Sequence, residues 1–247
     1  LTRSHKQLVF VRFRKTTQRG AAAGLTNKII YRDEFSKLFK TELKRVQQHA
    51  VDVTLDPDTA NPYLILSDDR KQVHCGEVRR KRKLPDNPKR FTYFVNVLGE
   101  QSFSSGRFYF EVQVKGKTDW DLGVATESIN RTESMSLSPK NGFWTVWLRN
   151  GYEYKACEDN KINLCLRCAP EKVGVFVDYE EGLVSFYDVD AAALIYSFTG
   201  CSFTEKLFPY FSPELNDDGT NSAPLIICPV NQTEIICAPI VSTVMGS

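Results

Sequence analysis

The segment Lys172–Asp188 reads KVGVFVDYEEGLVSFYD and decides the fold. Valine recurs at every second position from 173 to 177, and the run from 183 to 188 alternates in the same way. This period of two is typical of β-strands, and the polar link Tyr179–Gly182 between the runs predicts a hairpin turn. Gly182 can adopt a positive φ at little steric cost, as such turns often require. Because the hairpin is apolar on both faces, we expect a second sheet to pack over it.

Short runs of the same kind recur along the chain at intervals of about a dozen residues, which is typical of a sandwich. The predicted strands are Tyr63–Ser67, Gln72–Cys75, Phe91–Val97, Arg107–Val114, Asp121–Thr126, Gly142–Leu148, Tyr152–Lys155, Lys161–Cys168, Lys172–Asp178, Leu183–Asp188, Ala193–Phe198, Leu207–Phe211 and Leu225–Ile227. Asn150-Gly151 predicts a two-residue hairpin. No long amphipathic helix follows residue 51, which leaves no room for βαβ units. The sequence therefore predicts an all-β fold, a two-sheet antiparallel β-sandwich.

An N-terminal α-helix is expected ahead of the sandwich. Residues 1–30 form a basic segment that we expect to be weakly ordered, and residues 31–51 form the helix. Its apolar positions Phe39, Leu43, Val46 and Ala50 have 4-3-4 spacing. Two interpretations stay open, because this helix could be the end of a coiled coil or could pack on the following domain. The domain is expected at 52–230, and 231–247 is a C-terminal tail.

Charge and cysteine content bound the functional classes. Residues 1–50 hold twelve Lys/Arg against three Asp/Glu, whereas the rest of the 247 residues hold twenty against twenty-seven. The seven cysteines have no framework spacing and no signal peptide opens the sequence, which indicates a reducing, cytoplasmic location. The apolar runs are too short for a membrane span. The sequence does not begin with Met, so we expect a piece of a longer protein.

Three motifs occur in a fixed order along the chain. They are Leu55-Asp56-Pro57, Phe110-Glu111-Val112-Gln113 and Val177-Asp178-Tyr179-Glu180. In this order they resemble the LDP, WEVE and LDYE motifs of the PRY–SPRY domain in tripartite-motif (TRIM) proteins and butyrophilins. The resemblance covers about Val51 to Val230. Within the family, the sequence most resembles fish TRIM proteins of the "bloodthirsty" type. Phe110 and Val177 depart from the motifs but stay apolar, so the fold should survive.

The sequence shows no convincing metal-binding motif and no convincing pair of nucleophile and base. Cys165-Leu166-Arg167-Cys168 is the one CxxC, and on a predicted strand its thiols point to opposite faces. On a strand, His74 and the adjacent Cys75 also point to opposite faces, so we do not expect His74 to activate this thiol. Asp178, Glu180 and Glu181 are explained as turn and edge residues of the hairpin. We expect no enzymatic activity and no cofactor in this chain, with zinc only where a RING or B-box lies upstream.

The resemblance implies that loops at one end of the sheets form a shallow binding pocket. By position, these are the basic loop 79–90, the segment 126–141, the strand end 147–150 and the loop 214–221. The candidate partner-binding residues are Trp147, Arg149, Asn150, Leu215, Asn216, Arg82 and Lys83. Strand alternation places Trp147 and Arg149 on one face and Trp144 in the core. Trp and Arg are common binding hot spots, although plain packing explains Trp147 equally well.

The resemblance further implies the substrate-recognition module of a TRIM-type E3 ubiquitin ligase that acts in innate immunity. Its partner would be a protein ligand or ubiquitination substrate. A homodimer formed through an upstream coiled coil would let two weak sites act together. One alternative is a nucleic-acid or anionic-surface binder that uses residues 1–19 and 79–90, with strongly salt-dependent affinity. Another is the same domain in a butyrophilin or an immune-receptor host.

Overall fold

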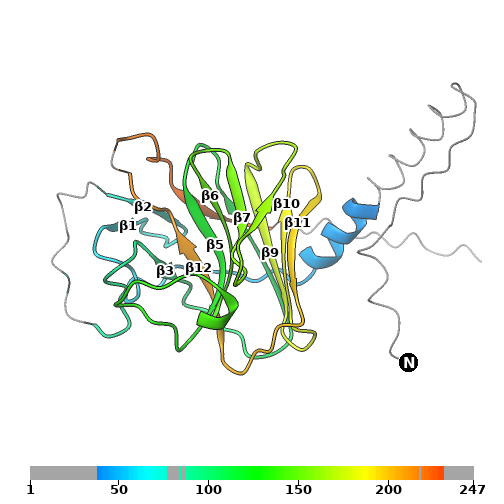
Figure 1. Ribbon diagram of the computed structural model, residues 1–247, viewed down its shortest axis with the longest axis horizontal. Helices are drawn as coiled ribbons and strands as arrows, with labels where there is room; N and C mark the ends of the chain where they lie inside the picture. The colour runs from blue at the N-terminus through cyan, green and yellow to red at the C-terminus, as the bar shows by residue number, and fades with distance from the viewer. Residues whose placement is uncertain (1–37, 77–83, 85–86, 217, 231–247) are drawn as a thin grey trace, which may run out of the picture. The chain divides into compact units, whose positions relative to one another are not determined.

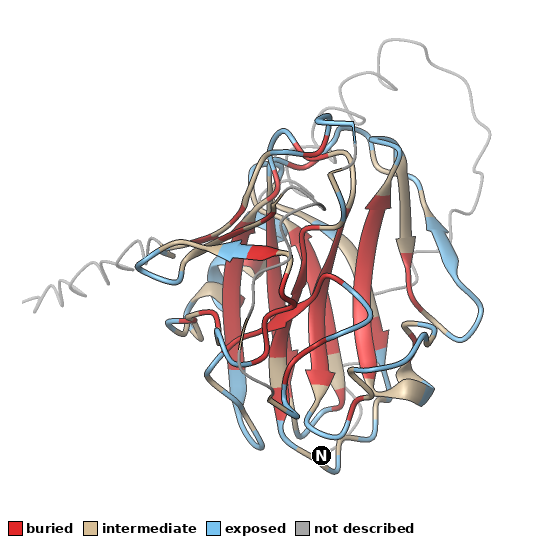
Figure 2. Ribbon diagram, turned by 90° about the vertical axis from the view of Figure 1, so that its left-hand side faces the viewer, coloured by how far each residue is buried: buried red, intermediate tan, exposed pale blue. Residues whose placement is uncertain are grey.

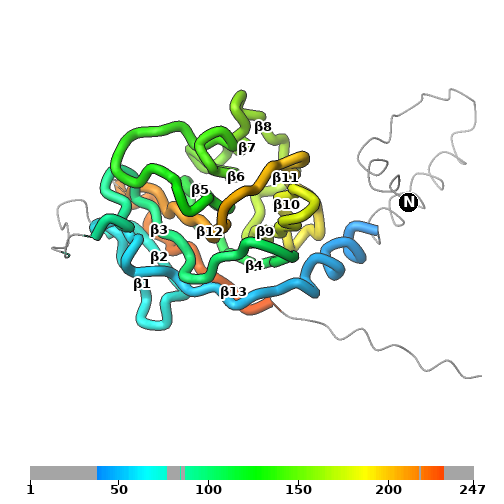
Figure 3. Tube along the Cα trace, turned by 90° about the horizontal axis from the view of Figure 1, so that it is seen from below, coloured from blue at the N-terminus to red at the C-terminus, as the bar shows by residue number. Residues whose placement is uncertain are grey.

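The computed structural model describes residues 38–76, 84, 87–216 and 218–230. Two antiparallel sheets pack face to face (Figure 1), and Figure 3 shows these two layers from below. The strands are β1 (Leu64–Leu66), β2 (Gln72–Cys75), β3 (Val97–Leu98), β4 (Arg107–Gln113), β5 (Trp120–Thr126), β6 (Phe143–Arg149), β7 (Glu153–Ala156), β8 (Ile162–Leu164), β9 (Lys172–Asp178), β10 (Leu183–Asp188), β11 (Ala193–Thr199), β12 (Leu207–Ser212) and β13 (Leu225–Cys228). A short 3₁₀ helix, η1 (Pro139–Asn141), precedes β6.

The seven-stranded sheet has the order β1-β2-β13-β4-β9-β10-β11, and the six-stranded sheet has the order β3-β12-β5-β6-β7-β8. The inward faces of both sheets form one apolar core, in which Phe110 of β4 meets Phe211 of β12 with ring centroids 5.9 Å apart. Figure 2 shows the buried residues concentrated along these strands. The predicted two-sheet antiparallel β-sandwich is confirmed.

One predicted strand is wrong over most of its length. Of Phe91–Val97, only Val97 lies in a strand, β3. The backbone N–H of Phe91 donates to Thr59 O and that of Thr92 donates to Arg131 O, so this segment bonds to loops. Alternating apolar residues alone could not reveal those partners.

The hairpin of β9 and β10 is formed as predicted, with Val184 opposite Val177. Gly182 has a φ of 60°, and a Cβ there would collide with the carbonyl oxygen of Cys201. The acidic residues of the hairpin are engaged in structural contacts, since Asp178 pairs with Arg107 at 2.6 Å and the Glu180 carboxylate accepts from Gly106 N. These contacts tie the hairpin to β4 and the loop before it.

The helix differs from its predicted extent. It continues through residue 47, and the next residues turn into a bridge between Ala50 and Tyr109 of β4. The predicted end at 51 is wrong because His49 O and Val51 N bond to Tyr109 instead of continuing the helix. Leu43 and Val46 are buried on the outer face of the seven-stranded sheet, whereas Phe39 is 42% exposed. The end of the helix therefore packs on the domain, while residues 31–37 lie outside the described part.

Candidate partner-binding site

The outer face of the six-stranded sheet carries the predicted residues of β6. Trp144 points inward, where its ring meets Phe203 edge-on with centroids 4.8 Å apart. Trp147 lies opposite Asp121 of β5 and Lys155 of β7. Strand alternation therefore separates Trp144 from Trp147 as the sequence predicted, and Arg149 shares the face of Trp147.

Trp147 is covered by positively charged side chains. The Cζ of Arg149 lies 4.9 Å from the centroid of the Trp147 ring, and the Nζ atoms of Lys155 and Lys161 lie 5.2 and 5.6 Å from it. Only 8% of Trp147 is exposed. The indole therefore offers little surface of its own to a partner and instead orients the cations by cation–π attraction.

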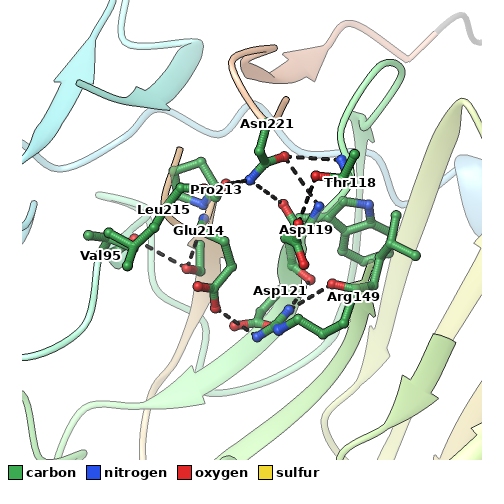
Figure 4. Close-up of polar contacts among 12 residues, drawn as sticks. Val95, Thr118, Asp119, Asp121, Arg149, Pro213, Glu214, Leu215 and Asn221 are labelled. Carbon is green, nitrogen blue, oxygen red and sulfur yellow. Dashed lines mark hydrogen bonds and ion pairs between the residues drawn. The ribbon is translucent and has the colours of Figure 1, made fainter. Parts of the chain in front are cut away.

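Arg149 is held between two carboxylates (Figure 4). Its Nη2 lies 2.8 Å from Asp121 Oδ1 and 2.7 Å from Glu214 Oε1. Its Nη1 also donates to Trp120 O at 3.1 Å. Asp121 is buried, and this burial raises its pKa well above the ordinary value even though Arg149 opposes the shift. Burial works to lower the pKa of Arg149, but the two carboxylates outweigh it and leave that pKa raised.

Asn221 fixes the loop that carries Leu215. Its buried side chain donates from Nδ2 to the carbonyl oxygens of Asp119, Pro213 and Leu215, at 3.1, 2.9 and 3.0 Å. Its Oδ1 accepts from the backbone N–H of residues 118 and 119 (Figure 4). Leu215 remains 45% exposed on this anchored loop. An apolar side chain is thus presented to solvent next to backbone groups that Asn221 holds in place.

Asn216 and Lys117 complete the anchoring of this loop. The Asn216 Oδ1 accepts from Asn221 N at 3.0 Å, so this predicted contact residue is engaged within the loop. Lys117 Nζ donates to the carbonyl oxygens of Asn221 and Ala223, at 3.3 and 3.0 Å. Burial lowers the pKa of Lys117 to about 8.

Asn150 lies in a three-residue loop, so the predicted two-residue hairpin is wrong. Arg149 pairs with Glu153, and residues 150–152 connect the two strands. Asn150 N donates to Asp119 Oδ1 at 3.1 Å, and Gly151 N donates to Thr118 O at 2.9 Å. Neighbouring loop residues therefore shape this connection, which a local turn signal cannot show. Asn150 is brought next to the loop that precedes β5.

These contacts define the Arg149 cluster, which consists of Asp121, Trp147, Arg149, Asn150, Glu214, Leu215, Asn216 and Asn221. Five predicted residues meet here. Asp121 and Lys117 lie outside the predicted binding segments. Glu214 and Asn221 bound the predicted loop 214–221, but neither was among the candidate contact residues. Sequence spacing does not reveal which side chains these four residues meet.

The segment 126–141 lies at the opposite end of β5 and β6, so the predicted pocket divides in two. Thr126 N donates to Gly142 O just before β6 begins, whereas Arg149 ends that strand. Arg131 donates to Lys89 O at 2.8 Å and to Glu127 O at 3.1 Å. A cleft of about 610 Å³ opens at this end, and we call it the Arg131 cleft; its lining is Asp56, Thr59, Pro88, Lys89, Leu98, Phe208 and residues 127–132.

Arg82, Lys83 and the proposed basic segment 1–19 lie outside the described residues. The predicted strand Lys161–Cys168 is shorter than expected, since β8 ends at Leu164 and both Cys165 and Cys168 are exposed in the bend that follows. Within the described ranges, no group of three or more His, Cys, Asp or Glu residues could hold a metal ion. The described helices include none with the length and apolarity to cross a membrane.

The fold defines a β-sandwich of two antiparallel sheets with connecting loops at both ends. The SPRY domain model matches residues 107–225, and the model of the SPRY-associated domain, PRY, matches residues 53–103. The chain therefore belongs to the PRY–SPRY family, whose domains mediate protein interactions, and the resemblance seen in the sequence is confirmed.

Relatives show the same domain in longer proteins. "Nuclear factor 7, brain" of Xenopus laevis is 53% identical over 171 residues, which are 69% of this chain and 28% of that protein. "E3 ubiquitin-protein ligase TRIM21" of Bos taurus is 46% identical over 188 residues, which are 76% of this chain and 40% of that protein. The chain thus spans well under half the length of these relatives.

A solved structure agrees with the fold. The crystal structure of the TRIM65 PSpry domain superposes with a TM-score of 0.62 at 23% identity, and the match covers 75% of this chain and 93% of that one. At this level of identity the likeness supports the sandwich architecture.

Proposed function

We propose that this domain recognises a protein partner through the Arg149 cluster. One observation carries the proposal: Leu215 is 45% exposed beside two anchors, the Asn221 hydrogen bond to its carbonyl oxygen and the Glu214–Arg149 ion pair. A pre-ordered apolar contact loses little conformational entropy when it binds, which favours affinity. Arg149 supplies the charged group beside it.

The proposal extends to the whole protein, in which this domain would select the substrates of a TRIM-type E3 ubiquitin ligase. It is supported by the name of the Bos taurus relative, which is an E3 ubiquitin-protein ligase. The setting we propose is cytoplasmic and in innate immunity, by analogy with the family. We also propose a homodimer through an upstream coiled coil, which would raise the avidity of two weak sites.

Leu215→Arg is the cleanest test of the site. This exposed change leaves the Arg149 ion pairs intact, whereas Arg149→Ala strips the buried Asp121 of its partner and disturbs folding as well as binding. Leu194→Arg on the edge strand β11 is a matched control, because Leu194 is 39% exposed and lies on the other sheet. Proteins retained from a cell lysate by the wild-type domain are quantified for both variants.

We expect Leu215→Arg to lose those proteins and Leu194→Arg to keep them. Both variants should unfold at the temperature of the wild type, since exposed substitutions change stability little. Full retention by a folded Leu215→Arg variant would remove this site from the account.

A further inference from the structure

Lys155 and Lys161 place two unneutralised charges beside the Arg149 cluster. Lys155 lies on β7 directly opposite Trp147, and Lys161 precedes β8, so separate parts of the chain bring both ammonium groups to one ring. In the part of the chain that the structure describes, neither lysine forms an ion pair with a carboxylate. Arg149, at the same ring, is already paired with Asp121 and Glu214.

The indole restrains these two side chains at the protein surface. A cation within about 6 Å of a Trp centroid is attracted to the ring, and this attraction limits the conformations of a flexible lysine. Lys161 is exposed and Lys155 is partly buried, so both ammonium groups can be approached from solvent. Two like charges held side by side raise the local positive potential, which an anionic group on a ligand would relieve.

We propose that the Arg149 cluster, together with the two lysines beside it, binds an acidic peptide segment of the partner, with Asp or Glu carboxylates bridging Lys155 and Lys161. The inference rests on the proposed function and names the chemistry that the site selects. Arg149 is already neutralised by Asp121 and Glu214, so the free positive charge is confined to the two lysines and offers no continuous track to a phosphate chain. A peptide can instead carry its carboxylates only where the lysines lie.

The test is selection from a phage-displayed library of random dodecapeptides. The wild-type domain should enrich peptides rich in Asp and Glu. Lys155→Ala with Lys161→Ala should abolish that acidic enrichment, and Lys155→Glu with Lys161→Glu should reverse it toward Lys and Arg. Lys40→Ala with Lys206→Ala is the matched control. Both of these lysines are exposed and lie away from Trp147, and their replacement removes the same net charge as the test variant.

A selected acidic peptide is then measured by fluorescence anisotropy. Loss of two exposed ion pairs should weaken its binding to the Lys155→Ala, Lys161→Ala variant about fivefold, with the control variant unchanged. An oligouridylate of matched length serves as the nucleic-acid probe. Its binding should be weaker than that of the peptide; tighter binding that needs the same two lysines would overturn the proposal in favour of RNA.

The outcomes separate this inference from the proposed function. If the wild type enriches peptides without an acidic excess and the uncharged variant Leu215→Ser abolishes their selection, the site stands and the acidic ligand is wrong. If Leu215→Ser enriches the same peptides as the wild type, the site itself is wrong. Acidic enrichment that survives loss of both lysines would also overturn the inference.

Discussion

The two ends of the β5–β6 pair each carry an arginine, and the two arginines are held in different ways. Arg149 lies between the carboxylates of Asp121 and Glu214, whereas Arg131 donates to the backbone oxygens of Lys89 and Glu127. Burial lowers the pKa of Arg131, while the carboxylates leave the pKa of Arg149 raised. The contrast shows that ion pairs hold the arginine at one end of the sheet. At the other end, neutral backbone carbonyl groups hold the arginine that lines the cleft.

Removal of each arginine should expose that difference most strongly. Arg149→Ala leaves Asp121 buried without its counter-ion, and we expect a loss of about 3–5 kcal/mol in the free energy of unfolding. Arg131→Ala leaves carbonyl oxygens at an open cleft that water can reach, so its cost should be about 1 kcal/mol. Urea denaturation of both variants measures the two values, and equal losses would contradict the comparison.

A second pair of variants sharpens the contrast between the loops. Asn221→Ala leaves buried carbonyl and N–H groups without partners and should cost about 2–4 kcal/mol. Asn130→Ala removes only local bonds, to the backbone N–H groups and side chains of Thr132 and Glu133 in an exposed loop, at about 1 kcal/mol. Thermal and urea unfolding would measure both costs. A loss of less than about 1 kcal/mol in the free energy of unfolding for Asn221→Ala would mean that the loop carrying Leu215 is not anchored as described.

Lys117 gives the Arg149 end a distinctive pH dependence. Burial lowers its pKa to about 8 from 10.5, so between these values the unfolded state binds more protons than the folded state. The free energy of unfolding of the wild type should therefore rise with pH across this window relative to Lys117→Met, by about 3 kcal/mol. Below pH 8 the difference between the two proteins should be constant. Denaturation at several pH values tests this, and a difference that stays flat up to pH 10.5 would contradict it.

Local pattern was enough to predict most of the fold. Alternation predicted the β9–β10 hairpin, and the core positions of Phe110 and Val177 follow from their apolar character on strands. Local pattern failed at residues 49–51 and 91–96, where backbone groups bond to distant segments rather than to their own neighbours. The hydrophobic periodicity therefore could not predict where the helix ends or which path the loop at 91–96 follows.

The site was predictable in its residue types but not in its arrangement. Strand alternation placed Trp147 and Arg149 on one face, but the partners of Arg149 depend on how β5, β6 and the 213–221 loop meet in space. Proximity of the predicted loops could not be inferred either, since segment 126–141 follows β5 at its far end. The partners of Arg149 and the separation of the loops depend on how the strands pair and pack in three dimensions. The spacing of residues along the sequence does not contain that information.

The most direct test of the central claim is to map the bound partner on the domain. Backbone amide chemical shifts are recorded for the wild-type domain before and after addition of a partner protein captured from lysate. Our account predicts the largest changes at residues 147–152 and 213–221, with residues 127–132 unaffected. Changes confined to residues 127–132 and 87–92 would contradict it and would assign recognition to the Arg131 cleft.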